Sequence, residues 1–64
     1  MKHLVEQYRQ YYRAALQRYT TDKSPEALHN LAYREGQLNG ALMVLHGGLV
    51  ACREIESIKM EGSN

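Results

Sequence analysis

Apolar and aromatic residues in the first twenty positions recur at intervals of three and four. The face that they form contains Leu4, Tyr8, Tyr11, Ala15 and Tyr19, and it is widened by Tyr12 and Leu16. This spacing is the period of one face of an α-helix, whereas a strand would alternate at every second residue. The pattern therefore predicts a first helix over residues 2–19.

A second helix is predicted to begin at Pro25. The polar segment 20–23 interrupts the first pattern, and Ser24 then precedes Pro25 and Glu26. A serine oxygen can cap the free N–H groups of a helix N-terminus, and proline at the first helical position gives up no hydrogen bond. Glu26 adds a negative charge near the positive end of the helix dipole.

The second helix carries a seven-residue repeat of apolar positions. One seam position holds Leu28, Glu35, Leu42, Leu49 and Glu56, and the other holds Leu31, Leu38, Leu45 and Cys52. A stripe of this kind is typical of a helix packed lengthwise along another helix. Because the repeat stays in phase across Gly47 and Gly48, it predicts one long helix over residues 25–59, with a bend allowed at the glycines. The alternative is a break there and a short third helix from Leu49, since two glycines cost about 2 kcal/mol of helix propensity.

These patterns predict an all-α fold, in which a helical hairpin over residues 1–60 forms a single domain and residues 61–64 form a flexible tail. A chain of 64 residues buries only about 60% of the surface of its unfolded form, so such folds usually add disulfides, a metal or oligomerisation. The chain has one cysteine and no group of residues with structural-zinc spacing. The first helix can cover about half of the second, whose segments 41–45 and 49–52 are apolar on nearly every side. We therefore expect a homo-oligomeric helical bundle with an interface formed by Gly36, Leu38, Gly40, Leu42, Leu45, Leu49 and Cys52.

Charge and hydropathy limit the partners and the cellular location that we expect for the protein. The net charge is +1, and residues 1–23 carry +3 against −2 for the remainder. A net charge this close to zero does not indicate a polyanionic partner. The longest apolar run, 41–45, is far shorter than the roughly 20 residues that span a bilayer, and the charged start lacks the apolar core of a signal peptide. We expect a cytoplasmic protein that does not enter a membrane.

The tyrosines and arginines of the first helix form the unusual part of the composition. The residues that share this candidate ligand or partner face are Tyr8, Arg9, Tyr12, Arg13 and Arg18. Arginine can hold phosphate through two hydrogen bonds, and tyrosine can stack on a base, so a nucleotide or single-stranded nucleic acid is one interpretation. The alternatives are a protein-binding patch, or tyrosines at a half-buried surface beside solvated arginines. Duplex DNA is not favoured, because the second helix is apolar where a recognition helix is polar and basic.

Catalysis is not indicated. Glu35 and Glu56 replace leucine on the seam, where polar residues often fix the register of packed helices. No nucleophile, general acid or oxyanion donor set accompanies these carboxylates. The three histidines, His3, His29 and His46, are scattered. The sequence therefore predicts no enzyme, no cofactor and no metal site.

In size and texture the chain resembles small helical accessory proteins of bacteriophages and prophages, which include inhibitors of host defence systems. That resemblance rests on length and character and assigns no functional residue. It favours a homo-oligomeric protein that binds a host macromolecule. The alternatives are an oligomer that sequesters a small anionic ligand, such as a signalling nucleotide, and a structural subunit of a larger assembly such as a virion. In each case Leu42→Asp or Gly40→Leu is expected to break the assembly.

Overall fold

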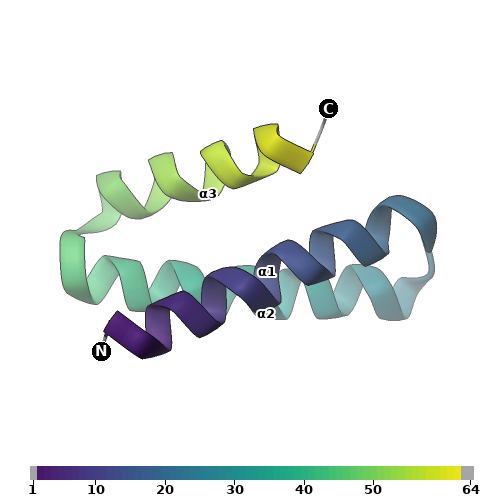
Figure 1. Cartoon of the computed structure of the whole chain (residues 1–64), viewed down its shortest axis with the longest axis horizontal. Coiled ribbons are helices and arrows are strands. Elements are labelled where there is room, and N and C mark those ends of the chain that lie inside the picture. Colours follow the sequence, from purple (N-terminus) through teal and green to yellow (C-terminus); the bar gives the residue numbers. More distant parts are fainter. Residues whose placement is uncertain (1, 63–64) are drawn as a thin grey trace.

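Residues 2–62 fold into three α-helices (Figure 1). The computed structural model describes residues 2–62, in which α1 spans Lys2–Thr21, α2 spans Pro25–His46 and α3 spans Gly48–Gly62. Helices α1 and α2 form an antiparallel hairpin, and α3 folds back along it in the same direction as α1. The molecule measures 32 × 20 × 17 Å. The prediction of an all-helical fold is confirmed.

The turn between α1 and α2 forms as the sequence predicts. Ser24 caps α2 with backbone angles in the extended region, and its Oγ accepts a hydrogen bond from the Ala27 amide at 3.2 Å. The Ser24 amide in turn donates to Asp22 Oδ1 at 3.0 Å, which lowers the pKa of that carboxyl group. Pro25 occupies the start of the helix, where no amide hydrogen is needed. The predicted helix start at Pro25 is therefore confirmed.

The prediction of one continuous helix over residues 25–59 is wrong. Helix α2 ends at His46, and Gly47 reverses the chain with φ 93° and ψ 164°. This region of backbone space is essentially open to glycine alone, because any Cβ atom would clash with the backbone. Helix α3 begins at Gly48, one residue before the alternative start, and extends through Glu61 to Gly62. The last two residues of the predicted tail, 63 and 64, lie outside the described residues.

The core lies between the hairpin and the underside of α3. Its buried residues come from all three helices and are Val5, Tyr12, Leu38, Leu42, Ala51, Ile55 and Ile58. Leu38 and Leu42, which were expected at an interface between copies, are fully buried within the single chain. Because Gly47 brings α3 back over them, one chain supplies the cover that we assigned to other subunits. Leu42→Asp therefore tests folding of the chain and not its assembly.

A network of polar side-chain contacts links the three helices beside this core. The Tyr12 hydroxyl donates to Glu35 Oε1 at 2.7 Å, and Lys59 Nζ lies 3.2 Å from the same oxygen. Burial of the Tyr12 ring and the neighbouring Glu35 carboxylate both raise the pKa of the phenol, so it keeps its proton and acts as the donor. Glu35 occupies a leucine position of the repeat because it accepts these contacts from α1 and α3.

We expect Tyr12→Phe to lower the free energy of unfolding by about 1–2 kcal/mol, because the hydrogen bond to Glu35 is lost while the ring stays in place. For a domain of this size the melting temperature should fall by roughly 4–15 °C, measured by circular dichroism. Tyr33→Phe is the matched control, since the exposed Tyr33 hydroxyl only accepts a bond from Gln37. Equal effects of the two changes would contradict the role given to Tyr12.

Candidate interaction surfaces

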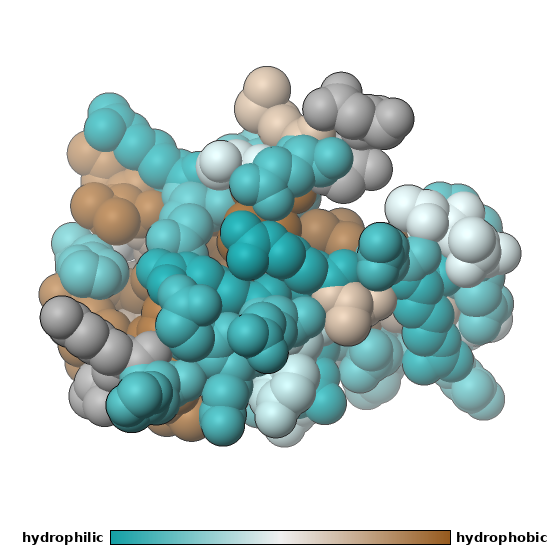
Figure 2. All heavy atoms as spheres, in the orientation of Figure 1, coloured by the Kyte–Doolittle hydropathy of each residue, from teal (hydrophilic) through white to brown (hydrophobic). Residues whose placement is uncertain are grey.

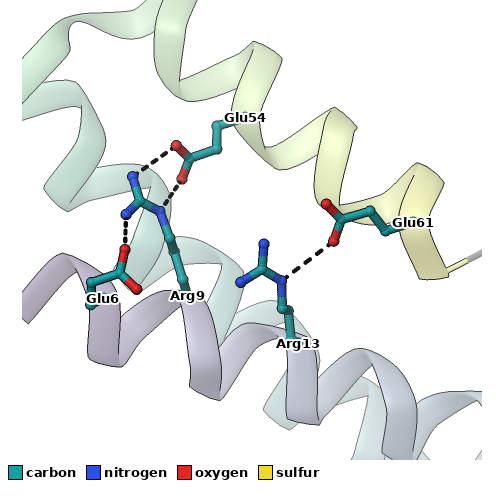
Figure 3. A network of polar contacts seen from close by, with 5 residues as sticks. All are labelled: Glu6, Arg9, Arg13, Glu54 and Glu61. Atoms are coloured by element: carbon teal, nitrogen blue, oxygen red, sulfur yellow. Dashed lines mark hydrogen bonds and ion pairs between the residues drawn. The ribbon is translucent and has the colours of Figure 1, made fainter.

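The arginine face of α1 is directed toward α3 (Figure 3). Arg9 grips the Glu54 carboxylate with two parallel hydrogen bonds, from Nε at 2.8 Å and from Nη2 at 2.9 Å. Its Nη1 also contacts Glu6 within α1. Only about a quarter of each side chain is exposed, 24% for Arg9 and 26% for Glu54. Two-point pairing of this kind is among the stronger polar contacts in proteins, and it lowers the pKa of Glu54.

The other two arginines of the predicted face are paired less firmly. Arg13 Nε lies 3.4 Å from Glu61 Oε2, and Arg18 Nη2 lies 3.7 Å from Asp22 Oδ2. These side chains are about half exposed, so their ion pairs add little stability. The surplus positive charge of the first half of the chain is therefore met by carboxylates of α3 and of the α1–α2 turn. Sequence reasoning did not find Glu54 and Glu61, which lie far from their partners along the chain.

The tyrosines of the predicted face separate in the fold. Tyr12 lies in the core, so its ring is not available for stacking in this conformation, and Tyr8 is half-buried against the same core. The exposed Tyr11 was not among the predicted site residues. The Arg34 guanidinium of α2 lies 4.7 Å from the centre of the Tyr11 ring and 5.5 Å from that of Tyr33. These three side chains, one from α1 and two from α2, form a surface of aromatic rings around an arginine, which we call the Tyr11–Arg34–Tyr33 cluster.

A hollow lies between the C-terminal parts of α1 and α3, where Figure 2 shows a notch with apolar side chains at its base. Its volume is about 560 Å³. The floor includes Leu16 and Ile58, and the walls carry hydrogen-bonding side chains. These wall residues are Gln10, Arg13, Gln17, Thr20 and Glu61. Of the five predicted ligand-face residues, the hollow contains Arg13.

A second groove, of about 490 Å³, runs between α2 and α3. Gly36 and Cys52, both predicted interface residues, line it from opposite sides. Gly36 and Gly40 are exposed, and a Cβ atom added at either would meet no atom within 4 Å. The chain therefore has room for a Cβ atom at Gly40, and the expectation that Gly40→Leu breaks the assembly stays a prediction.

Exposed aliphatic side chains gather at the end of the molecule where α2 turns into α3, seen as brown spheres in Figure 2. Val44 is 76% exposed and Leu49 67%, and the others in this apolar end are Leu4, Met43, Leu45 and Val50. Together they expose on the order of 500 Å², which lies within the range of the largest apolar patch on a typical monomer, a patch that is often functional. Two of the predicted interface residues, Leu45 and Leu49, thus lie on an apolar surface that this chain does not cover.

Comparison with protein-family models, curated proteins and solved structures finds no match for this chain. Within residues 2–62 no helix combines the length and the apolar character needed to cross a bilayer.

The Arg9–Glu54 pair makes stability depend on pH. A carboxyl group with a lowered pKa in the folded state stabilises the fold above its ordinary pKa of 4.5, and that contribution is lost as the pH falls through the folded value. We expect Glu54→Gln to lower the free energy of unfolding by about 1–2 kcal/mol at neutral pH. The variant should then lose less further stability than the parent between about pH 5 and pH 3, measured by urea unfolding.

The control for this experiment is a double-mutant cycle with Arg9→Gln. If the two side chains stabilise the fold through each other, the double variant is as stable as the less stable of the two single variants. Its loss of stability between about pH 5 and pH 3 then equals that of Glu54→Gln. Additive losses would show that the pair is not coupled.

Proposed function

We propose that this chain is a non-enzymatic protein that acts by binding, and that its apolar end associates with further copies of itself. The observation that carries the proposal is the exposure of Val44, Leu49 and their neighbours at the α2–α3 turn. Connections between helices usually carry polar residues, because they face water. An aliphatic surface at such a place is typical of a site that is covered in the working state.

The area of the apolar end supports the same proposal. Two apolar ends of on the order of 500 Å² each would bury close to the roughly 1,000 Å² that separates a biological interface from a casual contact.

With the apolar end occupied by another copy, the Tyr11–Arg34–Tyr33 cluster is the surface best suited to a partner macromolecule. Tyrosine and arginine are the residue types that carry most binding energy in protein interfaces. Both rings are exposed, and Arg34 is held by a hydrogen bond of 3.0 Å from its Nη1 to Gln37 Oε1. Such a binding role agrees with the resemblance in size to the small accessory proteins of bacteriophages.

We expect Val44→Asp and Leu49→Asp each to weaken self-association by about 100-fold or more, since each buries an unpaired charge at the contact. Analytical ultracentrifugation over a range of concentrations measures the change. Met60→Asp is the matched control, because Met60 is equally exposed, at 68%, near the other end of α3. A parent protein that stays at 7.4 kDa at all concentrations, or an unchanged Leu49→Asp variant, would contradict the proposal.

A second candidate function is sequestration of a small anionic ligand in the hollow between α1 and α3. The observation that favours it is the combination of Arg13 with the amide and hydroxyl side chains of Gln10, Gln17 and Thr20 over an apolar floor. Arg13 is only weakly engaged by Glu61, so it can turn to a ligand.

Native mass spectrometry of the protein as purified from cells tests this second candidate. A bound ligand should add a few hundred daltons per subunit, and Arg13→Ala should remove that mass while the helical content is unchanged. Arg53→Ala is the control, because Arg53 is exposed on α3 and lies outside the hollow. A mass equal to that of the protein alone would exclude sequestration of a ligand acquired in those cells.

A further inference from the structure

A single residue, Gly47, separates α2 from α3. The backbone hydrogen bonds of the two helices nearly join across it. The Gly47 amide donates to the Met43 carbonyl at 3.0 Å, and the Gly47 carbonyl accepts from the Ala51 amide at 3.1 Å, both with helical four-residue spacing. Rotation of the Gly47 backbone into the helical region would pair the next three amides, of residues 48–50, with the carbonyls of residues 44–46. The connection is thus a hinge whose straight form is a continuous helix.

We propose that two copies of this chain exchange α3, so that each α3 packs on the α1–α2 hairpin of the other copy. This proposal rests on the proposed self-association and names its geometry. The groove that receives the foreign α3 is the one that α3 fills within a single chain. Exchange of an identical element re-forms the same contacts between chains, which makes it a low-energy route to a dimer.

The contacts of α3 suit such an exchange, because they come from one apolar face and the two edges beside it, where Glu54 meets Arg9 of α1 and Lys59 meets Glu35 of α2. Ala51, Ile55 and Ile58 fill the core, and Glu54 accepts the two hydrogen bonds from Arg9. In the exchanged dimer each of these side chains meets the same partners, now on the other copy. The free energy of closing α3 within one chain is therefore recovered between chains.

Exchange also accounts for the position of the apolar end. Each α3 leaves its own hairpin at Gly47 and enters the other hairpin at the same point, so the two hinges lie next to each other. Val44, Leu49 and Val50, which are exposed around the turn, then lie on two straight helices that cross and cover one another. The seven-residue repeat that continues through the turn is the pattern expected of that straight helix.

A mixing experiment with reversed charges tests the exchange. In Arg9→Glu the ion pair becomes two carboxylates, and in Glu54→Arg it becomes two guanidinium groups, so neither variant can re-form it alone. In a mixed dimer with exchanged α3, both pairs are restored between chains. We expect the two variants, mixed in equal amounts, to form heterodimers in about tenfold or greater excess over the statistical ratio, measured by native mass spectrometry.

The matched control is the pair Arg18→Glu and Asp22→Arg. This ion pair joins α1 to the α1–α2 turn, so exchange of α3 cannot restore it. In both mixtures one reversal changes the net charge of +1 to −1 and the other changes it to +3, so general attraction between the chains is the same. A heterodimer excess confined to the Arg9 and Glu54 mixture supports exchange. Statistical mixing of both sets overturns exchange and leaves self-association standing, whereas a parent protein that never dimerises removes the proposed function itself.

A hinge variant keeps the proposal testable if the charge reversals fail to fold. Alanine at Gly47 is strained in the closed turn and favours the straight helix, so Gly47→Ala with Gly48→Ala should shift the dimerisation equilibrium at least about tenfold toward dimer. Gly36→Ala with Gly40→Ala is the control, since both sites lie within α2, away from the hinge, and an added Cβ atom meets no atom within 4 Å at either. A hinge variant that melts earlier without dimerising more strongly would overturn exchange.

Discussion

The fold depends on the backbone of Gly47. Among residues 2–62, Gly47 alone has a positive φ. With its ψ of 164° it adopts a conformation that residues other than glycine avoid. This reversal brings Ala51, Ile55 and Ile58 over Tyr12 and Leu42, and without it the hairpin would expose the inner face of α2. The buried tyrosine, the ion pairs to α1 and the aliphatic turn all follow from the same change of direction.

Charge complementarity then decides which edge of the hairpin α3 follows. Helix α1 holds arginines with few carboxylates beside them, and α3 presents Glu54 and Glu61 toward them. The pair to Glu54 is two-pronged and largely screened from water, whereas the pair to Glu61 is open to solvent. The first therefore orients α3, and the second adds little. The charge asymmetry along the sequence becomes an attraction between α1 and α3 inside the molecule.

Local chemistry made part of this fold predictable from sequence. The first helix and the Ser24 cap depend on neighbours within four residues, and both form as expected. The break at the glycines was only the alternative to a continuous helix, because the in-phase leucines describe a straight helix as well as a bent one. The burial of Tyr12 depends on the return of α3, and Glu54, which pairs with Arg9 across the helices, lies 45 residues away from it. Periodicity identifies a helical face, but it does not say which other helix covers that face.

The repeat across Gly47 has a physical meaning of its own. A turn that had to stay closed would gain from polar residues around it, since they would discourage both a straight helix and contact with another chain. Here Val44, Leu45, Leu49 and Val50 surround the turn, with His46 as the polar residue beside its glycines. Glycine permits the turn without excluding the helix. In the proposed exchange, the closed chain and the straight helix differ by the strain and hydration of a few residues, because α3 finds the same partners in either state. When the free-energy difference between closed chain and exchanged dimer is small, protein concentration decides which of them is populated. The conformation of one chain then depends on the presence of a second.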